Sequence, residues 1–195
     1  MRALNFFMAA PKKKTALMQS FKDIEAIKSN VIIYPTDTVY GIGCNAENEM
    51  LVERIFTIKG RDKKKPMSVI APNKKWILAN CAVSREILDK YLPGPYTLIL
   101  KKKNPDFLKY ATSGTHTLGV RIPAHRISKL VEVAGIPFIT TSANISGGKS
   151  PKTLSEIPDE VKNAADIIID GGTLSGTPST IVDCQSGAEK IIKRA

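Results

Sequence analysis

The sequence is poor in the residues that build disulfide frameworks and metal centres. It contains three cysteines that are far apart, Cys44, Cys81 and Cys184, and two histidines, His116 and His125, that lack the spacing of a metal site. Because no CxxC pair or His/Cys cluster is present, a disulfide scaffold is excluded. We predict buried free thiols and no protein-bound metal.

Long apolar runs are also missing, since no stretch approaches the roughly 18 residues of a membrane span. The segment MRALNFFMAAP places Arg2 before a short apolar run, but Asn5 interrupts it, and we reject a signal peptide. The chain is therefore expected to be cytoplasmic, without a membrane partner. We expect one domain over 1–195, with an N-terminal extension over 1–12.

Acidic residues are outnumbered. The 29 lysines and arginines exceed the 18 aspartates and glutamates, so the formal net charge is +11. Lysines cluster at 12–14, 63–65, 74–75 and 101–103. This balance favours polyanionic partners such as nucleotide phosphates or RNA, although lysine clusters are also common on ordinary soluble surfaces.

Hydrophobic periodicity predicts alternating strands and helices. Strands are expected at 31–34, 67–71, 96–100, 118–122, 136–141, 166–170, 180–184 and 190–193. Helices are expected at 13–29, 50–58, 76–80, after a Ser84 cap, at 126–134 and at 157–165. This alternation indicates an α/β domain with a mixed sheet.

The stretch from Ile32 to Ile70 organises the chain. A β-branched strand leads into the turn PTDTVYGIG, and an amphipathic helix over 50–58 then ends at Gly60, delivering Lys59 and Arg61. A strand–loop–helix unit with these side chains suits a small anionic ligand. The plainer alternative is an ordinary turn followed by a solvated run of charge.

Three hydroxyl-rich segments follow predicted strands: PTDTVYG, TTSANISGG and GGTLSGTPST. Ligands of open α/β sheets bind beyond the carboxyl ends of strands, so these segments could line one site. The same hydroxyls could instead be turn formers.

Other short motifs in the sequence do not match known catalytic or nucleotide-binding signatures. Gly148-Lys149-Ser150 imitates the end of a Walker A motif, but Ala143 stands where that motif needs glycine. Ser146 and Lys149 match S-x-x-K without the partner motifs of that enzyme class. The sequence has no GxSxG and no GxGxxG, so a Ser/His triad and a Rossmann site lack support.

Four segments occur in a specific order: YPTDTVYGIG, IFTIKGRDKKKPMSVI, LGVRIP and TTSANISG, with PSTIVD behind them. Over nearly its whole length the chain resembles the YrdC family of threonylcarbamoyl-AMP synthases, in its single-domain bacterial form. The resemblance implies a twisted open mixed sheet with flanking helices and a concave basic cavity. It implies synthesis of threonylcarbamoyl-AMP and pyrophosphate from L-threonine, bicarbonate or CO2 and ATP, for t6A37 modification of tRNA.

The resemblance also implies site residues. The residues matching the family's catalytic, triphosphate-binding set are Lys59, Arg61, Ser142 and Asn144. Those matching further ATP contacts are Lys65, Thr117, Ser150 and Lys193. The residues expected around threonine are Thr36, Thr38, Tyr40, Arg121, Thr140 and Ser179. A turn role for Ser142 and Asn144 and a surface role for Arg121 are the plainer alternatives.

The chain departs from the family pattern at Lys65, where relatives often have asparagine, and at Lys193, where many have arginine. It also departs at Ile70, where some members have histidine. The expected cofactors are ATP and Mg2+, with Mg2+ held mainly by phosphates, and no redox cofactor. Expected partners also include tRNA or double-stranded RNA and a downstream t6A transferase complex. The alternative function is a non-catalytic RNA-binding or ribosome-associated factor using the same basic cavity.

Overall fold

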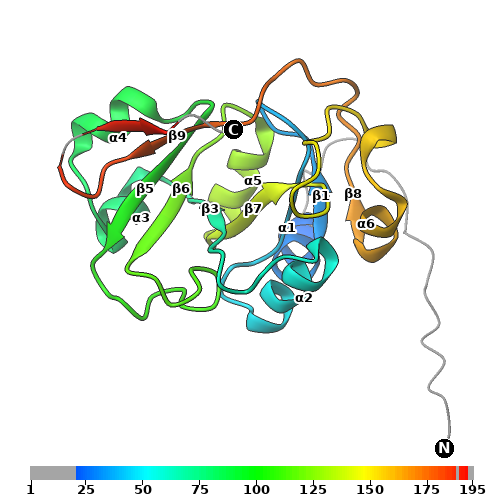
Figure 1. Ribbon diagram of the computed structural model, residues 1–195, viewed down its shortest axis with the longest axis horizontal. Helices are drawn as coiled ribbons and strands as arrows, with labels where there is room; N and C mark the ends of the chain where they lie inside the picture. Colours follow the sequence, from blue (N-terminus) through cyan, green and yellow to red (C-terminus); the bar gives the residue numbers. More distant parts are fainter. Residues whose placement is uncertain (1–20, 188, 193–195) are drawn as a thin grey trace, which may run out of the picture.

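Residues 21–187 and 189–192 are described by the computed structural model, and in them strands and helices alternate (Figure 1). The strands are β1 (Ile32–Tyr34), β2 (Gly41–Gly43), β3 (Ser68–Ile70), β4 (Cys81–Ala82), β5 (Tyr96–Lys102), β6 (Thr117–Arg121), β7 (Phe138–Ser142), β8 (Ile167–Ile168), β9 (Thr180–Asp183) and β10 (Lys190–Ile192). The helices are α1 (Phe21–Ser29), α2 (Glu49–Lys59), α3 (Lys74–Asn80), α4 (Arg85–Tyr91), α5 (Arg126–Ala134), α6 (Asp159–Ala164) and the 3-10 turn η1 (Leu154–Glu156). Within these ranges, no helix is both long and apolar enough to cross a membrane.

The strands join into one mixed sheet in the order β10-β9-β5-β6-β3-β7-β2-β1-β8, with β4 beside β5. β1 pairs antiparallel with β2 and parallel with β8, and β2 pairs antiparallel with β7. Consequently β1, β7 and β8 run in one direction and end at the same edge of the sheet. The hydroxyl-rich segments that follow these strands therefore start from one edge, as the sequence predicts.

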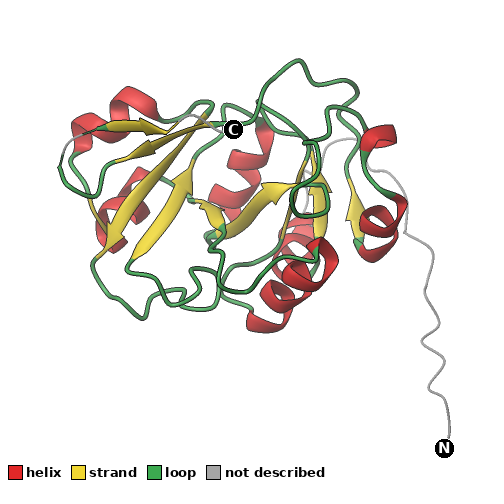
Figure 2. Ribbon diagram, viewed as in Figure 1, coloured by secondary structure: helices red, strands yellow, loops and turns green. Residues whose placement is uncertain are grey.

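Helices lie on both faces of the sheet (Figure 2). Each face carries an apolar cluster that includes side chains of these helices. On one face, Ile33, Val69 and Ile139 pack with apolar side chains of α2, α3, α4 and α6. On the other face, Ile70 and Phe138 pack with α1 and α5. The predicted α/β architecture with flanking helices is confirmed.

Farther along the sheet, the face that α1 and α5 cover becomes polar. Val69 pairs with Val120 and with Ile139, and Val120 pairs with Leu98. These four side chains all belong to the apolar cluster on the face opposite α1 and α5. Side chains alternate along strands, so their neighbours point to the α5 side. We term this set the polar face; it consists of Ser68, Thr97, Thr117, Arg121, Thr140 and Ser142.

The helix that delivers Lys59 begins and ends as the sequence predicts. The Asn48 side chain accepts from the Leu51 N–H at the first turn of α2, and Gly60 adopts a left-handed φ of 53° after the last. A residue with a Cβ is strained at this φ, whereas glycine adopts it freely. Gly60 therefore ends α2 and lets the chain turn sharply. α5 likewise spans the predicted residues Arg126–Ala134 and ends at Gly135.

The prediction of a plain turn over PTDTVYGIG is wrong at its end, where Gly41–Gly43 forms β2 between β1 and β7. Glycine is depleted in strands, and this masks the strand in the sequence. A Cβ at Gly43 would lie 1.8 Å from the Ile139 carbonyl oxygen, so only glycine fits. The short β4 was also missed. The predicted extension over 1–12 and the start of the helix over 13–29 lie outside the described residues.

Candidate functional site

The turn between β1 and β2 is held by its own hydroxyls. Thr36 Oγ1 donates to the Val39 carbonyl at 2.8 Å, accepts from the Thr38 N–H at 3.0 Å and lies 2.8 Å from Thr38 Oγ1. Since Thr36 has already used its hydroxyl proton, Thr38 donates in that last contact and keeps only acceptor lone pairs. Both threonines are buried, so the turn presents Asp37 and Thr38 in one orientation.

Arg121 ends β6 and reaches this turn from the polar face. Its Nη2 donates to Asp37 Oδ1 at 2.6 Å, while Nη1 and Nη2 lie 3.5 and 3.4 Å from Thr38 Oγ1. Burial lowers the pKa of the guanidinium and the Asp37 charge opposes this, but an arginine remains protonated. Its Nε is buried without a hydrogen-bond partner in the described structure. A guanidinium with a spare donor is suited to an anion.

Lys59 is buried at the end of α2, with 1% of its surface exposed. Its Nζ donates to the carbonyls of Ser142 at 2.5 Å and Asn144 at 2.6 Å, and reaches Asn144 Oδ1 at 3.5 Å. Burial, with a contribution from the Arg61 charge, lowers its pKa to about 8. These oxygens do not cancel the charge. A phosphate oxygen could replace the longest contact and gain a charge-assisted bond.

The loop after β7 is tied to α2 by backbone as well as side chain. The Ser146 N–H donates to the Lys59 carbonyl at 2.8 Å. Asn144 Nδ2 donates to the Ile145 and Gly148 carbonyls at 2.8 and 2.6 Å. Lys59 and Asn144 therefore act as one unit, with Ser142 half-buried at its rim.

Arg61 shapes the loop that follows α2. Its Nε donates to the Lys65 carbonyl at 3.1 Å and Nη2 to the Pro66 carbonyl at 2.9 Å. Burial lowers the pKa of this guanidinium. Among the described residues Arg61 forms no ion pair, so its charge is available to a ligand, whereas the Lys65 side chain is exposed.

The segment 170–179, which we term the strap, joins β8 at one end of the sheet to β9 near the other (orange in Figure 1). The Tyr40 hydroxyl accepts from the Gly171 N–H and donates to the Gly172 carbonyl, both at 2.8 Å. At Gly176 a Cβ would lie 2.3 Å from the Thr38 carbonyl oxygen, so the strap presses on the β1–β2 turn. Ser179 Oγ lies 2.8 Å from Thr97 Oγ1.

The structure thus gathers half of the predicted residues into two groups. Lys59, Ser142 and Asn144 form a phosphate-type group beside Arg61, and the turn with Arg121 forms a carboxylate-type group. Thr140 lies on the polar face, where it is buried.

Other predicted residues stand apart from these groups. The strap engages the Tyr40 hydroxyl, so a contact of Tyr40 with threonine stays a prediction. Thr117 lies on the polar face and Ser150 is half-buried, but no contact described in residues 21–187 joins either one to the two groups. Lys193 lies outside the described residues.

The prediction left out Asp37 and Thr97, which the structure brings to the site. Asp37 pairs with Arg121, and Thr97 contacts Ser179. A carboxylate between two threonines in a basic chain is a signal that could have identified Asp37. Thr97 gives no comparable signal, because it occupies an ordinary strand position.

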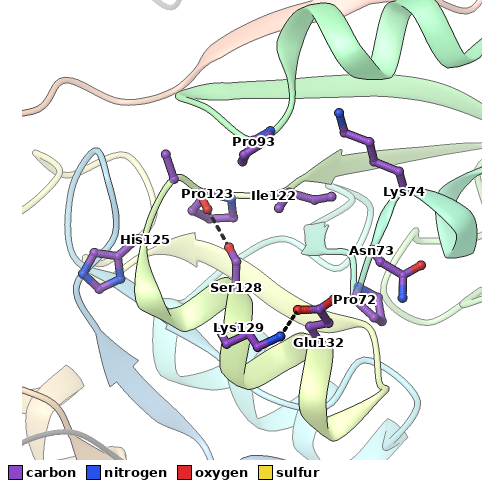
Figure 3. A pocket seen from close by; sticks show the side chains of 11 residues that line it. Pro72, Asn73, Lys74, Pro93, Ile122, Pro123, His125, Ser128, Lys129 and Glu132 are labelled. Atoms are coloured by element: carbon purple, nitrogen blue, oxygen red, sulfur yellow. Dashed lines mark hydrogen bonds and ion pairs between the residues drawn. The ribbon is translucent and has the colours of Figure 1, made fainter.

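The described residues line two cavities, the larger of which adjoins the carboxylate-type group through Ala124, whose N–H donates to Asp37. The larger, of about 410 Å³, lies beside α5 near Pro93 and Pro123, where Ser128 donates to the Pro123 carbonyl (Figure 3). The smaller has about 270 Å³ and lies near Lys63 and Tyr110. Neither is lined by a predicted site residue, so the concave basic cavity stays a prediction. In the part of the chain that the structure describes, no three His, Cys, Asp or Glu gather to hold a metal ion.

A mixed sheet with hydroxyls and cations at its strand ends is typical of α/β proteins that bind anionic ligands there. The family model Sua5_yciO_yrdC, described as "Telomere recombination", matches residues 25–195. The chain therefore belongs to the Sua5/YciO/YrdC family, and the resemblance found in the sequence is confirmed.

Relatives are similar over most of the chain. A Methanocaldococcus jannaschii protein is 40% identical over 174 residues, which is 86% of this chain and 80% of its own. Proteins named threonylcarbamoyl-AMP synthase include those of Pyrococcus abyssi (36% identical; 80% of this chain, 47% of that one) and Idiomarina loihiensis (33%; 76% and 83%). The chain thus spans about half of the Pyrococcus protein.

Solved structures share the fold. Sua5 of P. abyssi in complex with L-threonine superposes with a TM-score of 0.71 and 35% identity, over 79% of this chain and 47% of that one. YciO of Escherichia coli gives a TM-score of 0.76 at 27% identity, over 89% and 87%. The open, mixed-sheet fold predicted from the resemblance is confirmed.

Proposed function

We propose that this chain is an L-threonylcarbamoyladenylate synthase, which forms threonylcarbamoyl-AMP and pyrophosphate from L-threonine, bicarbonate or CO2 and ATP. The observation that carries this proposal is the pair of anion-binding groups, one suited to a carboxylate and one to phosphates. The names of the relatives and the threonine complex of P. abyssi Sua5 support the same reaction. By this proposal the enzyme is a nucleotidyltransferase.

The carboxylate of threonine would bind Arg121, whose Nε is buried and unpartnered in the described structure. Thr38 offers lone pairs to the substrate's ammonium or hydroxyl group, and Thr140 and Ser179 lie on or beside the same polar face. This arrangement would fix the amino group of threonine relative to ATP. Positioning of this kind supplies a large part of the rate in reactions between two bound reactants.

Lys59 and Arg61 would bind the triphosphate. The threonine ammonium releases one proton to solvent, and its amine then adds to CO2 and releases a second proton, which gives a carbamate. A carbamate oxygen forms a bond to the α-phosphorus, and the bond from that phosphorus to pyrophosphate breaks. Negative charge grows on the leaving pyrophosphate, where the two cations stabilise it. By this proposal a Mg2+ ion would be held mainly by the phosphates. Such an ion, when bound, neutralises phosphate charge.

The product would serve t6A37 modification of tRNA through a separate transferase complex, in the cytoplasm. The net charge of +11 supports contact with tRNA or double-stranded RNA. These partners belong to the proposal.

The test is release of pyrophosphate from ATP, with and without threonine and bicarbonate. We expect release to require both. Serine should be a poor substrate, because a lost methyl costs about 1–3 kcal/mol, and valine should be nearly inert, since it leaves hydroxyl-binding groups unpaired. Release that ignores threonine, together with salt-sensitive RNA binding, would indicate an RNA-binding factor instead.

A further inference from the structure

The Asp37 carboxylate has its two oxygens committed to different parts of the fold. Oδ1 accepts from Arg121 Nη2 at 2.6 Å, and Oδ2 accepts from the Ala124 N–H at 2.8 Å. The side chains of Asp37 and Arg121 are only 11% and 8% exposed. Since the carboxylate cannot rotate without losing a bond, it braces the β1–β2 turn against the connection from β6 to α5.

This pairing does not use all the hydrogen-bond donors of the Arg121 guanidinium. A bidentate arginine–carboxylate pair uses two donors, but Asp37 accepts from one, and the contacts to Thr38 Oγ1 are long at 3.4 and 3.5 Å. Arg121 Nε is left buried and without a partner in the described structure. A buried donor without a partner is unfavourable, which points to an acceptor that arrives with a ligand.

We propose that Asp37 is a positioning residue, which holds the Arg121 guanidinium so that Nε faces the carboxylate of the amino-acid substrate. This inference rests on the proposed function and assigns a task to a side chain that does not itself touch the substrate. The arginine side chain is long and rotatable, so an unbraced guanidinium would shift the carboxylate and with it the reacting amine. Asp37 would therefore set substrate affinity and preference for a carboxylate.

The first test is Asp37→Asn, because asparagine has one acceptor oxygen and must release either Arg121 or Ala124. We expect KM for threonine to rise about tenfold or more, with KM for ATP unchanged. The preference for L-threonine over L-threoninamide should collapse, since the carboxylate loses its oriented partner. A merely structural ion pair would leave this preference intact.

The matched control is Asp166→Asn, which alters a second arginine–carboxylate pair, one whose side chains are partly exposed. Arg54 Nη1 and Nη2 donate to the two oxygens of Asp166 at 2.8 Å each, and the Val31 N–H donates to Asp166 Oδ2. This pair joins α2 to the start of β8 and belongs to neither anion-binding group. We expect Asp166→Asn to lower the melting temperature and to leave the preference for threonine over threoninamide unchanged.

The outcomes separate this inference from the proposed function. A wild-type chain without threonine-dependent pyrophosphate release contradicts the function alone, and calorimetric titration with threonine and threoninamide then tests Asp37 directly. Unchanged threonine affinity and preference in Asp37→Asn overturn the inference. If that variant does not fold, Asp37→Glu keeps the charge but moves it by one methylene. A wild-type KM for threonine in Asp37→Glu would likewise overturn the inference.

Discussion

Lys59 and Lys102 are two buried lysines in similar chemical surroundings, yet only one stands at the candidate site. Their exposed fractions are 1% and 4%, and neither forms an ion pair among the described residues. Burial lowers the pKa of both ammonium groups. A buried lysine surrounded by oxygens is therefore no sign of function by itself.

The difference lies in what each lysine holds. Lys102 Nζ donates to the carbonyls of Pro105 and Phe107 and to Thr112 Oγ1, all within the connection from β5 to β6. Lys59 instead joins α2 to the loop after β7, at the edge where three hydroxyl-rich segments meet, and Arg61 follows it. Under the proposed function, position at the strand ends and a second cation nearby are what distinguish Lys59 from the structural Lys102.

Replacing each lysine by methionine should separate the two roles most strongly. We expect Lys59→Met to reduce kcat/KM for ATP about 100-fold or more, as loss of a transition-state donor does. Lys102→Met should leave kcat/KM unchanged and lower stability by roughly 1–3 kcal/mol, since buried acceptors lose their donor. Steady-state kinetics and chemical denaturation of both variants measure this. An inactive but stable Lys102→Met would remove the distinction.

Arg61→Ala tests whether the second cation belongs to the site. A charge-assisted bond is worth about 1.5–3 kcal/mol, so kcat/KM for ATP should fall roughly 10- to 100-fold while the fold survives. Lys103→Ala is the control, because Lys103 follows Lys102 and its Nζ donates to the Leu78 carbonyl at 2.7 Å. Pyrophosphate release and melting curves give both readouts. Full activity in Arg61→Ala would show that Arg61 does not bind ATP and would contradict the proposal of two cooperating cations.

The pH profile should report Lys59 and not Lys102. Since the pKa of Lys59 is lowered to about 8, kcat/KM for ATP should fall about tenfold per pH unit above 8 as the charge is lost. Unfolding does not explain such a fall, because a lysine pKa lowered on folding makes stability rise from pH 8 towards 10.5. Lys102→Met should retain the profile, and a flat profile in the wild type would contradict the assignment.

The smallest effect is expected at Lys65, whose side chain is exposed. Lys65→Ala should weaken ATP use by roughly two- to fivefold, and added salt should remove most of the difference, because exposed charges contribute little and are screened. Lys64→Ala provides the control from the same lysine cluster. Equal effects of the two variants would mean that Lys65 acts only through the general charge of the loop.

The sequence predicts this fold well where local chemistry and tertiary packing agree. The strand at Ile32–Tyr34 is β-branched and buried, and α5 has an apolar face and ends at a left-handed glycine. β2 was not predicted, because glycine has a low propensity for strands. Gly43 is nevertheless required there, since β7 approaches it too closely for a side chain.

The candidate site shows the same contrast between residues with a sequence signal and residues that only the tertiary structure brings together. Lys59 was predicted from its place after an amphipathic helix, and Arg121 was predicted from the resemblance to the family. Asp37 and Thr97 were not, because their importance comes from partners 84 and 82 residues away. The buried position of Lys102 was equally invisible, since its cluster has the composition of an ordinary exposed surface.

The contact of Gly176 with Thr38 has a consequence for synthesis of the chain on the ribosome. The β1–β2 turn is translated early, but the strap that presses on it emerges only after most of the domain has been made. Arg121 likewise arrives long before the strap. A nascent chain would therefore hold the carboxylate-type group without its covering strap until residues 170–179 leave the exit tunnel, whereas the contacts of Lys59 with Ser142 and Asn144 can form earlier.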